Sequence, residues 1–134
     1  MFAAFDGRAF YWSSLAEAVH SVNIAANSRV FLAIFDSTVP DKSGHGVYVR
    51  ATVRELTDRR SIAIGLEALA ARKRETSKPV EDHVAPQPRR VYEAVPESMW
   101  TNVLHEDHGY YFDERIEISI ADLRPARGRQ RGTK

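Results

Sequence analysis

The chain has 134 residues, of which 43% are hydrophobic and 28% are charged, so it is long enough for one hydrophobic core and too short for two. It contains no cysteine, which excludes disulfides, thiolate metal sites, iron–sulfur clusters and cysteine nucleophiles. No apolar run approaches the roughly 18 to 20 residues that span a bilayer, and no basic segment followed by a long apolar stretch opens the chain. We therefore expect a cytoplasmic protein with no membrane partner.

The net charge of +1 hides an uneven distribution of charge along the chain. The last eleven residues hold five basic groups and no acid, which leaves 14 basic against 18 acidic residues in the rest. The body of the protein is therefore slightly acidic and does not favour nucleic-acid binding. We expect one domain over residues 1–124 and a basic disordered tail over residues 125–134, with nonspecific anion contact by the tail as an alternative.

The first part of the chain predicts a β-hairpin followed by a short helix. Residues 2–5 and 9–13 are apolar or aromatic runs joined by an aspartate–glycine pair, which tolerates positive φ. Residues 14–17 fit the capping-box pattern, in which a serine and a glutamate satisfy each other's backbone donors. A helix should follow and end near Asn27.

The middle of the chain predicts two strands and a second helix. Residues 29–35 form a dense β-branched and aromatic run, which indicates a buried strand. Residues 46–56 alternate between apolar and polar side chains, as a half-buried strand does. Asp58 is placed to cap a helix whose inward residues recur at spacings of three and four, namely Ile62, Leu66, Leu69 and Lys73.

The last third of the chain returns to β character after a connection. Residues 75–90 contain three prolines mixed with charge and follow neither period, so we expect a surface connection. Residues 98–104 and 111–120 predict strands. About six antiparallel strands and two helices result, so the fold class is mainly β, a closed or half-closed β-barrel with flanking helices.

Two sets of segments resemble the pyridoxamine 5′-phosphate oxidase-like family. The first set consists of Phe-Tyr-Trp-Ser-Ser at residues 10–14, His-Ser-Val-Asn-Ile-Ala-Ala-Asn at residues 20–27, and Val-Phe-Leu-Ala-Ile-Phe-Asp-Ser-Thr at residues 30–38. The second set consists of residues 90–96, 100–102 and 113–118. Together the matches cover about residues 5 to 124 and agree in order and spacing.

The resemblance implies an FMN-binding split barrel that forms a homodimer, with one flavin mononucleotide in each cleft between the subunits. Some relatives use a deazaflavin or haem instead. For the phosphate, the resemblance points to the end of the second strand and to the following helix, at Ser13, Ser14, His20 and Ser21. For the ring, it points to strand backbone near Tyr11 and Trp12, covered by Trp100 and Arg115 from the second copy.

The chain departs from the family pattern in two respects. Relatives begin with a further pair of strands, so the chain looks truncated at its N-terminus. Many relatives also carry cations in the helix where this chain has Val19 and Val22. Because a charge-assisted hydrogen bond contributes roughly 1.5–3 kcal/mol, losing two could weaken flavin binding by two or more orders of magnitude.

Each candidate residue also has an ordinary structural explanation. His20 could be a surface or capping residue, and Trp100 could be a core side chain. Adjacent residues of a strand face opposite sides, so at most one of Tyr11 and Trp12 can point into the barrel. Arg115 could belong to an exposed, charged strand start. The His105-Glu-Asp-His108 segment contains metal-ligand types, but solvated loop residues explain it better, and we expect no metal.

The sequence therefore favours an oxidoreductase in which a flavin carries hydride or electrons and the protein supplies position and electrostatics. Its small-molecule substrate and any catalytic side chain are not readable from the sequence. Two alternatives stay open: a cofactor-poor dimeric split barrel that acts as a binding or structural module, and a deazaflavin-dependent reductase. A homodimer is expected in each case, because a split barrel of this length exposes apolar strand faces that a partner must cover.

Overall fold

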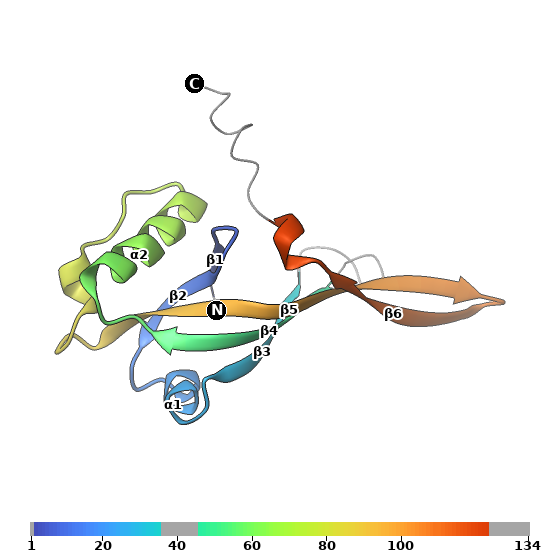
Figure 1. Cartoon of the computed structure of the whole chain (residues 1–134), viewed down its shortest axis with the longest axis horizontal. Helices are drawn as coiled ribbons and strands as arrows, with labels where there is room; N and C mark the ends of the chain where they lie inside the picture. Colours follow the sequence, from blue (N-terminus) through green and yellow to red (C-terminus); the bar gives the residue numbers. More distant parts are fainter. Residues whose placement is uncertain (1, 36–45, 124–134) are drawn as a thin grey trace, which may run out of the picture.

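The computed structural model describes residues 2–35 and 46–123. They form a six-stranded antiparallel sheet with a helix on each side (Figure 1). The strands are β1 (Ala4–Phe5), β2 (Phe10–Leu15), β3 (Arg29–Phe35), β4 (Gly46–Glu55), β5 (Arg89–Asp107) and β6 (Tyr110–Ile118). The helices are α1 (Val19–Ala26) and α2 (Arg59–Lys73), with 3-10 turns η1 (Val80–His83) and η2 (Ile120–Leu123). The mainly β fold class is confirmed.

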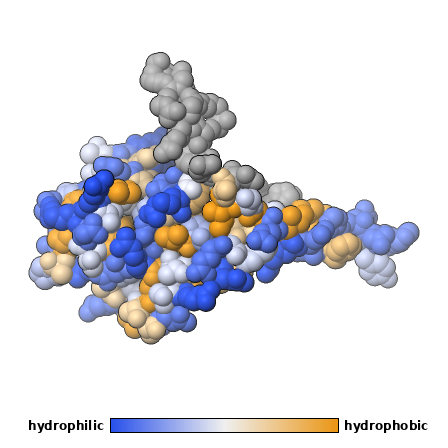
Figure 2. All heavy atoms as spheres, in the orientation of Figure 1, coloured by the Kyte–Doolittle hydropathy of each residue, from blue (hydrophilic) through white to orange (hydrophobic). Residues whose placement is uncertain are grey.

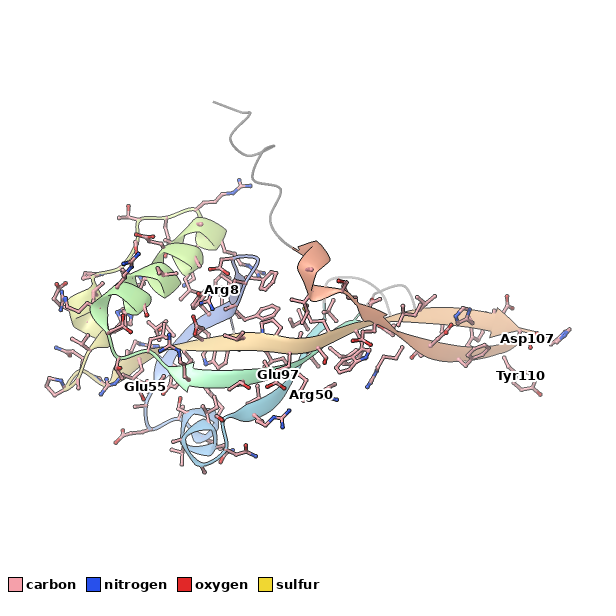
Figure 3. The ribbon with its side chains drawn as sticks, in the orientation of Figure 1. Arg8, Arg50, Glu55, Glu97, Asp107 and Tyr110 are labelled. Carbon is pink, nitrogen blue, oxygen red and sulfur yellow. The ribbon has the colours of Figure 1, made fainter. Side chains whose placement is uncertain are left out.

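Strand β5 is the centre of the sheet. The strand order is β1-β2-β5-β4-β3, and β6 pairs with β5 beside this path. The first part of β5 pairs with β2 and its last part pairs with β6. The middle of β5 pairs with β4 along its opposite edge. Figure 1 shows that the β5–β6 hairpin projects away from the body. We call this projection the arm; its tip, at Asp107 and Tyr110, is labelled in Figure 3.

Two hydrophobic cores lie on opposite faces of the sheet. On the face toward α2, which we call the helix face, Tyr11 and Val91 pack against Ile62 and Leu66 of the helix. The other side, which we call the barrel face, carries a core with Phe10, Trp12, Val49, Val53, Tyr92 and Met99. Because side chains alternate along a strand, Tyr11 and Trp12 enter different cores, as predicted.

The cap of α2 is confirmed, while the predicted start of the first helix is wrong. The Asp58 carboxylate accepts a hydrogen bond from the Ser61 backbone at 2.9 Å, which lowers the pKa of Asp58. Helix α1, by contrast, begins at Val19 rather than directly after residues 14–17. The reason is that Ser14 pairs with β5, so the sheet already satisfies the backbone that the capping box was expected to serve.

Strand β3 exists as predicted but is not buried. It pairs only with β4 among the described strands, so it lies at an edge of the sheet. Phe31 is 53% exposed and Ile34 is also exposed. A dense β-branched run therefore identified the strand but not its position, since burial depends on what packs against it.

Strand β5 is much longer than its predicted core at residues 98–104. It starts at Arg89, within the predicted connection, and tolerates Pro96 where its register with β4 shifts beside Arg50 and Ala51. The connection itself is mostly exposed, but His83 within it is buried. The last predicted strand ends at Ile118 rather than at residue 120.

The predicted tail at residues 125–134 lies outside the described residues. Within the described part of the chain, no helix is long and apolar enough to cross a membrane.

A buried carboxylate joins three strands and a turn. Glu93 of β5 is 3% exposed. It accepts hydrogen bonds from Arg8 in the β1–β2 turn, and from Nε of Arg54 in β4 at 3.0 Å. The Tyr11 hydroxyl of β2 donates to the same carboxylate at 3.2 Å, and Arg8 bonds that hydroxyl at 2.9 Å. The charge of Glu93 is thus compensated on two sides, as burial requires.

Replacing Glu93 with glutamine should destabilise the protein by about 1–3 kcal/mol, because a buried charge-assisted network loses its acceptor. Urea denaturation followed by circular dichroism measures this difference. Glu97→Gln is the matched control: Glu97 lies on the same strand and bonds Arg29 and Thr52, but is solvent-exposed. Equal denaturation midpoints for the two variants would contradict the role of Glu93.

Burial raises the pKa of the Tyr11 hydroxyl to about 12, against a smaller lowering by the hydrogen bond from Arg8. Unfolded tyrosine ionises near pH 10, so above that pH the unfolded state releases a proton that the folded state keeps. Stability should therefore fall between about pH 10 and pH 12, by about 1.4 kcal/mol per pH unit from this group. The urea midpoint should fall less steeply with rising pH in the Tyr11→Phe variant than in the wild type. Identical slopes for the two proteins would contradict the prediction.

Candidate functional site

A cavity of about 330 Å³ opens on the barrel face between α1 and the strands β2 and β3. Its wall has an aromatic and aliphatic part and a polar part. The apolar residues are Trp12, Ile24, Val30 and Leu32, and the polar residues are His20, Asn23, Asn27 and Arg29. Apolar walls with a few convergent polar groups are typical of sites for small molecules and cofactors. We call it the α1 cavity.

The structure brings three of the sequence-predicted site residues together at the α1 cavity. His20 and Trp12 line it. Ser14, at the end of β2, places its Oγ 2.8 Å from Nε2 of His20. This hydrogen bond orients the imidazole, and either group can donate, depending on the tautomer. The two segments that resemble the family, at the end of β2 and the start of α1, therefore also lie together in space.

Two buried polar atoms lack a hydrogen-bond partner among the described residues. They are Nε1 of Trp12 and Oγ of Ser21, on α1. An unsatisfied buried donor costs about 1–3 kcal/mol, so such groups in a native protein call for an explanation. Both atoms are closed to solvent, so a ligand in the α1 cavity reaches neither of them unless the surrounding side chains move.

The guanidinium of Arg29 leaves the α1 cavity for the opposite face of the sheet, because Arg29 pairs with Thr52 and alternates with Val30 of the barrel face. There Arg29 bonds Glu97 at 2.8 Å, and Thr52 donates to the same carboxylate at 2.6 Å. These bonds lower the pKa of Glu97, the bond from Thr52 having the larger effect. Val19 and Val22 are exposed on α1. The polar side chains that reach the cavity are therefore two amides and one histidine.

Tyr11 and Ser13 lie on the helix face, away from the α1 cavity. Tyr11 belongs to the Glu93 network, and Ser13 lines a different cavity beneath α2. Both residues are separated from Trp12 by the thickness of the sheet, because neighbouring side chains on β2 alternate. A ligand in the α1 cavity can reach their backbone but not their side chains.

Trp100 and Arg115 form a second cluster, which lies on the helix face beyond α2. The Arg115 guanidinium lies 4.5 Å from the Tyr48 ring and 5.9 Å from the Phe31 ring. Arg50 lies 5.2 Å from the Trp100 ring (Figure 3 labels Arg50). Such distances are those of cation–π contacts. We call these five residues the aromatic–arginine cluster.

The aromatic–arginine cluster and the α1 cavity occupy opposite faces of the sheet. Met99 packs with Trp12 in the barrel-face core, and the next residue, Trp100, points the other way. The same alternation separates Val49 from Tyr48 on β4. The predicted site residues therefore divide into two groups that do not meet within one chain.

The sequence did not single out the amides of the α1 cavity. Asn23 lies three residues after His20, and Asn27, the C-cap of α1, lies four residues after Asn23, which puts all three along one side of the helix. That spacing could have identified both asparagines.

The described residues contain no group of three or more histidine, aspartate or glutamate side chains placed to hold a metal ion. His105 instead bonds Glu114 across the arm at 2.7 Å, and His108 lies 3.4 Å from Asp107 at the tip.

Comparisons with known proteins identify the fold. No protein-family model matches the sequence, and no curated protein matches it. A protein of Bacteroides thetaiotaomicron VPI-5482 assigned to 5-nitroimidazole antibiotic resistance has a similar structure, with a TM-score of 0.60 and 12% identity over 75% of this chain. An F420 reductase has a TM-score of 0.51 and 22% identity over 74% of this chain. A heme-binding protein from Mycobacterium smegmatis has a TM-score of 0.54 and 15% identity over 84% of it.

The chain spans 64%, 74% and 44% of the lengths of these three proteins, respectively. At these identities the likeness concerns the fold. The chain therefore has the split β-barrel fold that its resemblance to the pyridoxamine 5′-phosphate oxidase-like family implies.

Proposed function

We propose that two copies of this chain form a flavoprotein that binds FMN and transfers hydride or electrons between the flavin and a small molecule. The split-barrel fold supports this proposal, and so does the presence of an F420 reductase among the structural neighbours. The family resemblance of residues 10–14 and 20–27 points to the same site that the α1 cavity occupies.

The observation that carries the proposal is the division of the candidate residues between two faces of one sheet. The α1 cavity has a floor and polar groups but is open, and the aromatic–arginine cluster offers rings and guanidiniums on the other face. A second copy related by a two-fold axis can place its cluster over the first copy's cavity, and the reverse contact follows from the symmetry. The complete site would then exist only in the dimer.

Exposed apolar side chains offer the surface for such a dimer. Phe31 and Ile34 are exposed on the edge strand β3, and the arm exposes Leu104, Tyr110, Tyr111, Phe112 and Ile116. Figure 2 shows hydrophobic residues both on the body and along the arm. Tyr110, at the tip, is 77% exposed. Burying these groups against a second copy would stabilise the dimer by the hydrophobic effect.

In the proposed site, each group has a physical role. His20, held by Ser14, and the amides of Asn23 and Asn27 would contact the phosphate and the hydroxyl chain. Trp12 forms part of the wall against which the ring would rest. Trp100 and Arg115 of the second copy would cover the ring and exclude water. The flavin supplies the redox chemistry, so no side chain needs to act as an acid or base.

A subunit-mixing experiment tests the two-chain site. His20→Ala and Arg115→Ala should each weaken FMN binding about tenfold or more, as measured by quenching of flavin fluorescence, because each damages both sites of its own dimer. After the two variants are mixed and allowed to exchange subunits, about a quarter of all sites should be intact and should recover tight binding. Sedimentation velocity checks that the wild type is a dimer.

The two-chain site would be overturned by recovery of FMN binding in a protein of monomeric mass. It would also be overturned if FMN binding did not recover although the subunits were shown to exchange. A mixture of His20→Ala with Asn23→Ala is the control: both changes lie on α1, so every mixed dimer stays damaged and no recovery is expected.

Restoring a cation on α1 should tighten FMN binding. Val19 is exposed and precedes His20, so Val19→Arg places a guanidinium near the proposed phosphate position with little cost to folding. We expect a gain of about tenfold in affinity, from one added charge-assisted hydrogen bond. Val19→Gln provides a neutral side chain of comparable reach and should give much less. Unchanged titration curves for the arginine variant would count against the phosphate placement.

The exposed valines also favour the alternative of a cofactor-poor dimeric module. The visible spectrum of the freshly purified protein and the wild-type FMN titration separate the two: a colourless protein that leaves flavin fluorescence unchanged supports the module. Competition between FMN and the deazaflavin F420 on the same protein distinguishes the third candidate, a deazaflavin-dependent reductase.

A further inference from the structure

A second cavity, of about 410 Å³, lies on the helix face between α2 and the segment that leads to β5. In Figure 1 this segment runs beside α2 and then enters the sheet. We call it the α2 cavity. Ser13, which the strand alternation separates from the α1 cavity, lies in its wall. The two cavities are thus on opposite faces of β2, and the family resemblance accounts for only one of them.

One part of the α2 cavity is apolar. Leu66, Leu69 and Ala70 of α2 line it together with Phe2. The first three of these residues are largely buried and belong to the folded body. A volume of about 400 Å³ lies within the range of small-molecule pockets, and this wall fits an aromatic or aliphatic group.

The other part of the cavity carries positive charge. Lys73, Lys78 and Arg89 line it, against the acids Glu75 and Asp82. Lys78 lies 4.0 Å from Glu75, a weak exposed contact, and Lys73 lies 4.9 Å from the Phe2 ring centroid. The excess of cations favours a ligand with a negative group.

A buried histidine adds a directional group. His83 lines the cavity although it is only 3% exposed, and its Nδ1 lies 3.0 Å from the Pro79 carbonyl oxygen. That oxygen can only accept, so Nδ1 carries a hydrogen and donates it. In the neutral ring Nε2 is then an acceptor, which suits a hydroxyl of a ligand rather than its anionic group. Ser13 and Thr76 add two hydroxyls to the wall.

We infer that the α2 cavity binds a small organic anion, with an apolar body against Leu66 and Leu69 and a carboxylate or phosphate among Lys73, Lys78 and Arg89. The site is independent of the flavin site, because it lies on the other face of the sheet and shares no lining residue with the α1 cavity.

Calorimetric titration with three naphthalene probes tests this inference. 1-Naphthyl phosphate and 1-naphthoate carry the same body with different anionic groups, and 1-naphthol carries no charge. We expect at least one anion to bind with a Kd below about 1 mM and to bind about tenfold more tightly than 1-naphthol. The stronger of the two anions identifies the chemistry of the natural ligand as a phosphate or a carboxylate. No binding of either anion up to about 5 mM would overturn the inference.

A matched pair of variants on α2 tests the location. Lys73→Gln should weaken anion binding about tenfold, because Lys73 lines the cavity, whereas Arg60→Gln removes an exposed cation of the same helix outside the cavity and should change little. Equal affinities for the two variants would overturn the placement. Backbone amide shifts in NMR spectra give a second measurement: they should change around Leu69, Thr76 and His83, and a response confined to α1 or the arm would contradict the site.

The test is separable from the proposed flavin function. Anion binding is measured on the purified protein without flavin and repeated with FMN present. Unchanged anion affinity in the presence of FMN supports two separate sites, and competition would show that the α2 cavity is not independent. A protein that does not bind FMN at all leaves the anion experiment fully interpretable.

Discussion

The alternation of side chains along β5 constrains both the packing and the placement of the candidate sites. This strand pairs with β2, β4 and β6, and the residues of its first part face α2 and the barrel core by turns. Glu93 faces the helix side and receives Arg8 and Arg54, while Tyr92 and Ala94 enter the barrel core. The register shift beside Pro96 then resets which residues face which side.

Stability and recognition are separated along the same strand. The first part of β5, around Val91 and Ala94, is buried between the two cores and tied to its neighbours by the Glu93 network. Its last part forms the arm, where apolar side chains remain exposed. A folded body with a projecting hairpin that exposes apolar side chains is suited to association, because the hairpin needs no further folding before it meets a partner.

The two cavities differ in the chemistry that they offer. The α1 cavity combines a tryptophan wall with two amides and a histidine, which suits a large ring with polar groups. The α2 cavity combines aliphatic side chains with an excess of cations, which suits a smaller anion. Adjacent serines of β2 contribute to different cavities: Ser13 lines one, and Ser14 orients the histidine of the other.

Local patterns in the sequence determined the elements whose cause is local. Alternation identified β4, the Asp58 cap and its periodic residues identified α2, and the opposite directions of Tyr11 and Trp12 followed from the strand itself. Tertiary pairing decided the rest. It extended β5 to 19 residues through a charged, proline-containing stretch, left β3 at an exposed edge, and divided the candidate site between two faces. The physical reason is that periodicity records which side chains share a face, whereas only the packed sheet determines what covers that face.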